Sequence, residues 1–226
     1  MINKSVLIWA GYYDDRWNAT NWIEGGINDS EYSIIKLAYK LQSKGYDVTV
    51  AGNVKSELLW GVKWVNEDIL LSNRGPRGLN EAFDLRVKDH YNILIGCNYI
   101  HFIRHLEDVN ISFDKAYFWM HQDGYYPWYK GNELNQCKDY FKHPKLKAII
   151  GISKTHAKTL KKSAKNIFHY TPLDSNKYIH FITHPLDLKD NTESQTPPLM
   201  NETLHMWLEK SSWDLTMNEW ISMFEN

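Results

Sequence analysis

The sequence predicts an α/β fold: a Rossmann-like three-layer sandwich in which helices cover both faces of a mostly parallel sheet. Two observations predict it. Strand-length apolar runs alternate with helix-period segments along most of the chain, and this alternation requires crossover connections that place helices on both faces. One run, residues 92–97 (NILIGC), is continuously apolar after its first residue, which is typical of a strand buried on both faces of a parallel sheet.

The individual elements follow from this alternation. The apolar residues of the first predicted helix, residues 33–44, recur at three- and four-residue steps, and Gly45 follows where a C-cap glycine belongs. Further helices are predicted at residues 101–106 and, after Ser153 as N-cap, at residues 155–163. Residues 72–80 predict a loop. The predicted strands are residues 5–10, 47–51, 62–65, 92–97, 115–120, 147–152 and 166–170.

Changes in composition divide the chain near its C-terminus. Residues 1–187 form the predicted Rossmann-like domain. Residues 188–200 (LKDNTESQTPPLM) are polar, contain two prolines and lack periodicity, so they predict a linker. Residues 201–226 predict a helical appendage with helices at 202–210 and 213–224. The apolar anchors of these helices are Trp207, Trp213, Leu215, Trp220 and Ile221.

Charge and cysteine content narrow the class of protein. The net charge of −1 over 226 residues gives no support for nucleic acid or an anionic membrane as a partner. No stretch has the length of a membrane span or the pattern of a signal peptide, so we expect a soluble, cytoplasmic protein. Cys97 and Cys137 do not form a disulfide framework, and Cys97 is expected to be a buried thiol inside a strand.

The loop between the first strand and the first helix carries a glycine pair. Gly25 and Gly26 permit close backbone approach, and a helix N-terminus beside such a loop favours an anionic ligand such as a phosphate or carboxylate. A plain strand-to-helix turn explains the pair equally well. Asn28 and Glu31 have the spacing of a capping box, which is a structural role, and both are also candidate ligand contacts.

His121 is the candidate catalytic residue. It follows a predicted buried strand at the carboxyl edge of the sheet, where open α/β folds place ligands. An imidazole there can bond a sugar hydroxyl or stabilise charge on a departing phosphate. The alternative is a hydrogen-bonded histidine at a strand end. Gln122 and Asp123 adjoin it as candidate contacts, and a turn role before Gly124 explains Asp123 better than a role as a base.

Other candidates belong to the same predicted rim. Asn98 and Tyr99 directly follow the strand at residues 92–97. Ser153, Lys154 and Thr155 start a helix and can help to bind an anion, although an ordinary N-cap explains Ser153 by itself. An aromatic loop is the candidate acceptor platform, or else a packed loop over the sheet edge; its rings belong to Tyr125, Tyr126, Trp128 and Tyr129.

Two further clusters are interpreted as solvated surface. His101 and His105 are one helical turn apart, but no third ligand stands at suitable spacing, so we expect no metal and no resident cofactor. A modest positive face on one helix is formed by lysines 158, 161, 162 and 165, and it predicts no nucleic-acid binding.

Six segments occur together in an order and spacing typical of one enzyme family. In chain order they are Gly25–Gly26 with Ser30–Glu31, LAYKL (37–41), KGYDVTV (44–50), YFWMHQD (117–123), KAIIGISKTHAKTL (147–160) and HPLD (184–187). They resemble the N-terminal, Rossmann-like domain of GT-B glycosyltransferases of the group 1 type, which are retaining and depend on nucleotide sugars. The segment SSWDLTMNEWISMF at 211–224 resembles the last helix of these enzymes, which returns to pack on the first domain.

The resemblance implies transfer of a sugar from a nucleotide-sugar donor to a glycan or other hydroxyl acceptor, with His121 contacting the transferred sugar. It also implies a second, donor-binding domain, for which nothing after residue 187 is a counterpart; Glu202 and Glu209 are one residue too close for the family's glutamate pair. We therefore expect little transfer by this chain alone, and either a partner subunit with the donor site or a homodimer. The alternative is a non-catalytic, Rossmann-like module that binds a glycan or nucleotide.

Overall fold

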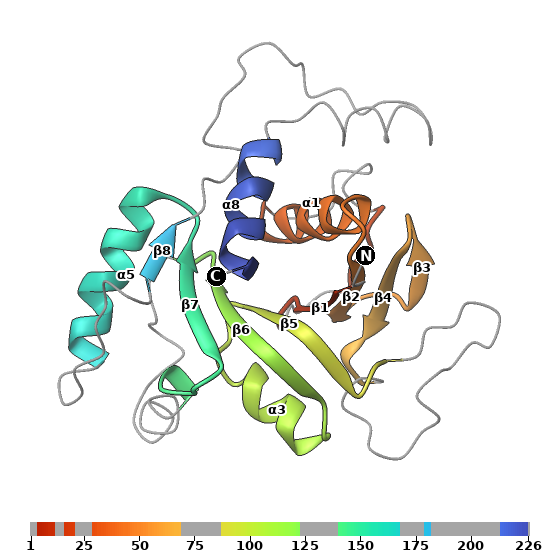
Figure 1. Ribbon diagram of the computed structural model, residues 1–226, viewed down its shortest axis with the longest axis horizontal. Coiled ribbons are helices and arrows are strands. Elements are labelled where there is room, and N and C mark those ends of the chain that lie inside the picture. The colour runs from red at the N-terminus through yellow and green to blue at the C-terminus, as the bar shows by residue number, and fades with distance from the viewer. Residues whose placement is uncertain are drawn as a thin grey trace, which may run out of the picture.

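The computed structural model describes residues 4–11, 16–20, 29–68, 87–122, 140–167, 179–181 and 213–225, and these contain an eight-stranded sheet (Figure 1). The strand order is β3-β4-β2-β1-β5-β6-β7-β8, and every neighbouring pair is parallel except β3 and β4. The predicted α/β class with a mostly parallel sheet is thereby confirmed. The strands are β1 (Ser5–Trp9), β2 (Asp47–Gly52), β3 (Glu57–Leu59), β4 (Val62–Asn66), β5 (His90–Cys97), β6 (Ser112–Met120), β7 (Leu146–Gly151) and β8 (Ile179–Phe181).

The chain reverses its direction of travel across the sheet between β1 and β5. From β1 it moves outward to β2 and then to the edge pair β3 and β4. It returns to β5 on the other side of β1 and adds β6, β7 and β8 in turn. Leu7 of β1 is paired with Leu94 of β5 at this junction. The order is consistent with a Rossmann-like fold, in which ligands bind outside the carboxyl ends of the strands at such a switch point.

Helices cover both faces of the sheet. Successive residues of a strand point to opposite faces of the sheet. Ile93 therefore joins the core under α1 (Asp29–Ser43) and α8 (Trp213–Glu225), while Leu94 joins the core under α3 (Phe102–Asp108) and α5 (Lys154–Ile167). In Figure 1, α1 and α8 lie together on one side of the sheet and α3 lies on the other. Burial on both faces explains the continuously apolar sequence of β5.

Helix α1 ends where the sequence predicts. Gly45 has φ = 88°, its N–H donates to the Gln42 carbonyl at 2.9 Å, and Tyr46 N–H donates to the Leu41 carbonyl at 3.1 Å. This is the Schellman arrangement, which a glycine permits at no steric cost. The helix begins at residue 29 rather than 33 because its first turn is polar and escapes the apolar periodicity; the capping-box spacing from residue 28 indicates the observed start.

Two features differ from the prediction. The strand predicted at 166–170 is wrong in its first two residues, since α5 continues to Ile167, and the other three lie outside the described residues. The helical spacing of Ala157, Leu160 and Ile167 is the signal for that continuation. The last described strand is instead β8, which is parallel to β7. The short β3 was not predicted. It is joined to β4 by a type I′-like turn at Trp60 and Gly61 (φ = 53° and 75°), and tryptophan gives no turn signal.

The C-terminal helix α8 packs on α1 and on the sheet. Of its predicted anchors, Trp220 is buried and Ile221 is partly buried. Trp207, the side chains of Trp213 and Leu215, and the segments predicted at 72–80, 188–200 and 202–210 lie outside the described residues. None of the helices in the described part of the chain is long and apolar enough to cross a membrane.

Candidate functional site

Three neighbouring strands end side by side at the carboxyl edge of the sheet. β5 ends at Cys97 and is followed by Asn98, β6 ends at Met120 and is followed by His121, and β7 ends two residues before Ser153. Because these strands are adjacent and parallel, the residues that follow them share one rim. The structure thus places Asn98 and His121 together, as expected from the sequence.

A hydrogen bond joins the exit of β6 to the exit of β5. His121 N–H donates to Asn98 Oδ1 at 2.7 Å, and Asn98 N–H donates to the Trp119 carbonyl at 2.9 Å. Asn98 has φ = 59°, a left-handed conformation that asparagine tolerates better than most residues. The peptide that precedes His121 is therefore held against the neighbouring strand exit.

His156, in the first turn of α5, holds the other side of the rim. Its Nδ1 accepts a hydrogen bond from Ile152 N–H at 3.1 Å, so the ring proton is on Nε2, which donates to the Gln122 carbonyl at 2.6 Å. The side chain is only 6% exposed. Ser153 Oγ accepts His156 N–H at 3.1 Å, which confirms Ser153 as the N-cap. His156 was not predicted from the sequence, where the available signal was its place three residues after that N-cap.

The imidazole of His121 is linked to the C-terminal helix through one intervening ring. The centroids of the His121 and Trp119 rings are 4.2 Å apart. The Trp119 indole in turn meets Trp220 of α8 edge-on, at 5.2 Å and 78°. Trp119 and Trp220 are both buried, so the ring that supports His121 belongs to the core between β6 and α8.

Two more side chains on the same face of β6 bind the end of α8. Tyr117 Oη donates to the Met223 carbonyl at 2.7 Å, and Lys115 Nζ donates to the Phe224 carbonyl at 3.0 Å. The last carbonyls of a helix have no intrahelical partners, and a cation near them is favourable. Alternate residues of β6 therefore secure α8 along a line that ends at the candidate catalytic histidine.

At the switch point the exits of β1 and β5 come into contact. A Cβ on Gly11 would lie 2.8 Å from the Cys97 carbonyl oxygen, and Gly11 has φ = 89°, so only glycine fits here. This glycine was not predicted as a site residue, although it follows the first predicted strand. The Cys97 side chain is buried as predicted, and burial raises its thiol pKa far above the ordinary value, which makes it unreactive.

The interpretation of His101 and His105 as a solvated face is wrong. His101 is buried and lies 4.8 Å from the Tyr99 ring and 5.6 Å from the Tyr140 ring. His105 is partly buried, 5.6 Å from the Trp9 ring, and this burial lowers the pKa of its imidazole against the opposing effect of a nearby aspartate. Tyr99, a predicted contact residue, belongs to this aromatic cluster. In the described part of the chain, no three His, Cys, Asp or Glu residues are grouped to hold a metal ion.

A carboxyl group that the sequence did not single out lies at the exit of β4. Glu67 directly follows that strand, and burial, with a smaller effect of Asp68, raises its pKa. Its Oε2 is buried and has no hydrogen-bond partner among the described residues. A carboxyl group of this kind is a candidate proton donor at the ligand edge of the sheet, but β2, β1 and β5 separate its strand from that of His121.

The remaining predicted site residues divide into two groups. Glu31 lies in the first turn of α1 and is buried, while Gln122 and Lys154 are exposed at the rim and Ser153 is half-buried. Six others lie outside the described residues: Gly25, Gly26, Asn28, Asp123, Tyr125 and Trp128.

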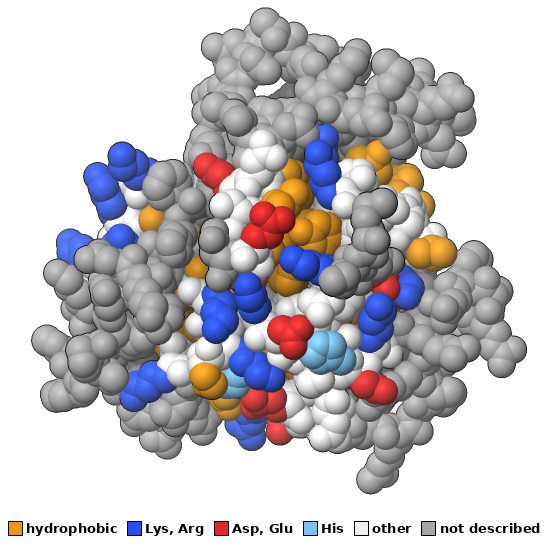
Figure 2. Space-filling model, viewed as in Figure 1, with side chains coloured by type: hydrophobic (Ala, Val, Ile, Leu, Met, Phe, Trp, Pro, Cys, Tyr) orange, Lys and Arg blue, Asp and Glu red, His pale blue; other side chains and the backbone are white. Residues whose placement is uncertain are grey.

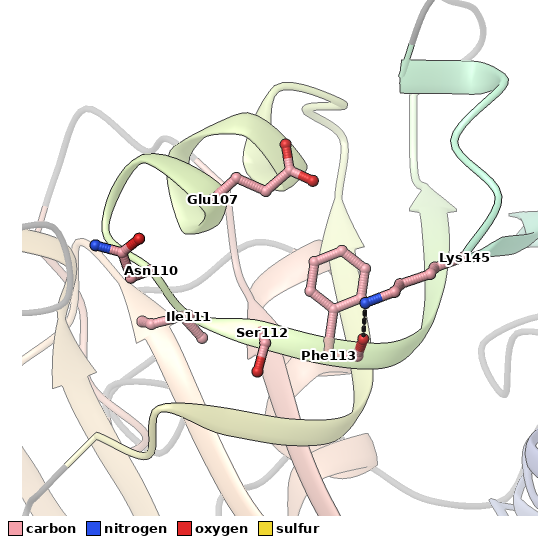
Figure 3. A pocket seen from close by; sticks show the side chains of 6 residues that line it. All are labelled: Glu107, Asn110, Ile111, Ser112, Phe113 and Lys145. Atoms are coloured by element: carbon pink, nitrogen blue, oxygen red, sulfur yellow. Dashed lines mark hydrogen bonds between the residues drawn. The ribbon is translucent and has the colours of Figure 1, made fainter.

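A pocket of about 330 Å³ opens at the opposite, amino edge of the sheet, where α3 ends and β6 begins (Figure 3). Lys145 extends over the Phe113 ring there and donates from Nζ to the Phe113 carbonyl at 2.7 Å, so its ammonium group is already engaged. No residue predicted for the site lines this pocket. The lining residues are Glu107, Asn110, Ile111, Ser112, Phe113 and Lys145.

Basic and acidic side chains are mixed over the face shown in Figure 2, and apolar side chains are visible where α8 meets α1. This mixture agrees with the net charge of −1 and gives no field of one sign on the described part of that face.

In comparisons with known proteins, no family model matches this chain, and no curated protein matches it.

Proposed function

We propose that this chain is the acceptor-side, Rossmann-like domain of a GT-B glycosyltransferase, a three-layer sandwich that takes part in sugar transfer from a nucleotide-sugar donor to a hydroxyl acceptor. The observation that carries the proposal is the position of His121. It stands at the carboxyl end of β6, beside the switch point, with its backbone bonded to Asn98 at the neighbouring strand exit. Ligands of open α/β sheets bind at this edge.

The chemistry of the rim suits a phosphorylated sugar. An imidazole can bond a sugar hydroxyl and stabilise charge as a diphosphate departs. Nearby, α5 begins at Lys154, and a helix N-terminus presents N–H groups and a positive dipole end to an anion. In this proposal catalysis consists mainly of positioning and charge stabilisation, so no metal and no resident cofactor take part.

Transfer would need a donor site outside the described residues. We propose that a partner subunit, a second copy or a further domain supplies it and closes over the carboxyl edge of this sheet. The docked α8 supports this assignment, because it occupies the place that the resemblance gives to the returning last helix. The cytoplasmic location expected from the sequence is part of the same proposal.

A second candidate function is a non-catalytic module that binds a glycan or nucleotide. One observation favours it: two polar side chains of the rim, Asn98 and His156, already bond the protein's own backbone. Side chains that are engaged in this way shape a binding surface but are occupied with the protein's own backbone, which favours binding over catalysis.

A ligand-binding experiment distinguishes these two functions from a purely structural role in which the domain binds neither a nucleotide sugar nor a glycan. We expect one member of a panel of nucleotide sugars and glycan acceptors to raise the melting temperature, since a ligand at 100 times its Kd adds about 2.7 kcal/mol to the free energy of unfolding. His121→Ala should abolish this increase, and His143→Ala, at the opposite edge, should not. No shift with any nucleotide sugar or glycan would contradict both functions. A shift without transfer, even with a donor-domain partner added, would favour the binding module.

A further inference from the structure

The buried imidazole of His156 bonds two strand exits at once. Its Nδ1 accepts from Ile152 N–H, just after β7, and its Nε2 donates to the Gln122 carbonyl, just after β6. The bond to Gln122 is short, at 2.6 Å, and spans 34 positions of sequence. His156 therefore fixes the distance between the two strand exits. In the neutral ring Nδ1 can only accept the Ile152 N–H, so Nε2 carries the proton and donates to the Gln122 carbonyl.

We propose that His156 is a positioning residue that sets the orientation of His121. The backbone around His121 is held from both sides: Asn98 of the β5 exit accepts the His121 N–H, and His156 of α5 binds the carbonyl of the next residue, Gln122. The imidazole that these bonds flank lies against Trp119, with the ring centroids 4.2 Å apart. The consequence for sugar transfer rests on the proposed function, whereas the orientation of the ring does not.

Loss of the His156 ring removes partners from two backbone groups at once. The Gln122 carbonyl and the Ile152 N–H both lose their bonds, and backbone groups left without partners are costly unless the chain moves to find water. We expect the exit of β6 to be the part that moves, because Gln122 is exposed and its carbonyl can then bond water. We expect the His121 ring to leave its contact with Trp119.

His143 provides a matched control at the opposite edge of the sheet. Its Nδ1 accepts a backbone N–H, from Lys145 at 3.3 Å, and its Nε2 lies 3.2 Å from Glu107 Oε1. Like His156, it accepts a backbone N–H at Nδ1, but its Nε2 faces a carboxylate instead of a backbone carbonyl. It lies just before β7, rather than after it, and away from His121. Its replacement tests whether the loss of any histidine that makes two hydrogen bonds beside this sheet affects His121.

The experiment follows the ring resonances of His121 by NMR on the full chain. Because that ring lies 4.2 Å from an indole, its proton shifts report the contact directly. We expect His156→Ala to move them toward the values of a solvent-exposed histidine and His143→Ala to leave them in place. Unchanged shifts in His156→Ala, or equal changes in both variants, would overturn the proposal.

Two conservative variants keep the test decisive if His156→Ala does not fold. His156→Gln can still donate near the Nε2 position to the Gln122 carbonyl, and His156→Asn retains only an acceptor near the Nδ1 position. We expect wild-type His121 shifts with glutamine and displaced shifts with asparagine. The same displacement in both, or in neither, would count against positioning through Gln122.

A binding measurement connects the orientation with the proposed function. For a nucleotide sugar that stabilises the wild type, we expect His156→Ala to raise Kd about tenfold, the equivalent of about 1.4 kcal/mol, and His143→Ala to leave it unchanged. If the wild type binds neither a nucleotide sugar nor a glycan acceptor, the proposed function fails while the NMR shifts still decide the positioning. If it binds equally well after His156→Ala, the positioning has no functional effect and that part of the inference is wrong.

Discussion

The indole of Trp119 meets the indole of Trp220 edge-on, with ring centroids 5.2 Å apart, and it also lies against the imidazole of His121. Strand β6 and the C-terminal helix α8 are thus in direct contact beside the candidate site, although more than a hundred residues separate them in sequence. The core between them and the rim share one aromatic ring. Stability of this core and geometry of the site should therefore change together.

Trp220→Ala is expected to destabilise the protein and disturb the site. Removing a fully buried indole costs about 3–5 kcal/mol, from lost apolar burial and the cavity left behind. Urea unfolding measures the free energy, and the His121 ring shifts measure the site. Asn218→Ala is the control, because Asn218 is an exposed residue of the same helix. If the free energy of unfolding fell no more than in the control, α8 would contribute little to this core.

Tyr117→Phe is expected to lower stability by about 1 kcal/mol, since its hydroxyl donates to the Met223 carbonyl. Burial raises the pKa of Tyr117 to about 12, so the folded chain keeps a proton that the unfolded chain loses near pH 10. The stabilisation is therefore complete below pH 10 and is lost as the pH rises toward 12. Urea unfolding across this range should show a steeper fall for the wild type than for the variant. Parallel curves of unfolding free energy against pH for the two proteins would contradict this role of Tyr117.

Asn98 is expected to hold the exit of β6 in two ways, through its left-handed backbone conformation and through its side-chain acceptor. Asn98→Gly retains the left-handed conformation but removes the acceptor for His121 N–H, whereas Asn98→Asp retains an acceptor. We expect the glycine variant to lose about 1 kcal/mol and to show faster hydrogen exchange at His121 N–H, and the aspartate variant to remain near the wild type. Equal exchange in the two variants would mean that the bond does not hold the rim.

Gly96→Ala is expected to cost about 1–3 kcal/mol, because a Cβ there would meet the Phe102 ring at 2.2 Å and force α3 away from β5. Phe102→Leu combined with Gly96→Ala should cost less than the sum of the two single changes, and chemical unfolding of the four proteins measures this coupling. Additive losses would show that the ring and the glycine do not constrain each other.

Asp114 is expected to contribute a small, pH-dependent stabilisation. A hydrogen bond from Asn92 and the nearby His90 lower its pKa below 3.8, so the stabilisation is present above that pH and is lost as the pH falls through the folded value. The side chain is exposed, so less than about 1 kcal/mol is involved. Asp114→Asn should flatten the acid side of the stability curve. Asp108→Asn serves as the exposed control, and an equal flattening there would remove the specific role of Asp114.

The sequence by itself determined the features that depend on neighbouring residues. Apolar runs located most of the strands, the apolar steps and Gly45 located the body and end of α1, and Ser153 marked the start of α5. These signals are local, because strand burial, helix periodicity and capping act within a few positions of the chain. The parallel sheet followed from their alternation. Once the strands were parallel, His121 and Asn98 had to reach the same edge.

Only the tertiary structure decided how that edge is held. The bond of His156 to the Gln122 carbonyl and the contact of Trp119 with Trp220 join segments that are distant in sequence, and no local pattern encodes their meeting. The burial of His101 and the pairing of β3 with β4 likewise depend on what packs around them. The residue type determines which bonds a side chain can make. The packing of strands and helices determines which partner lies within reach, so the partner of each side chain is fixed only when the whole sheet has formed.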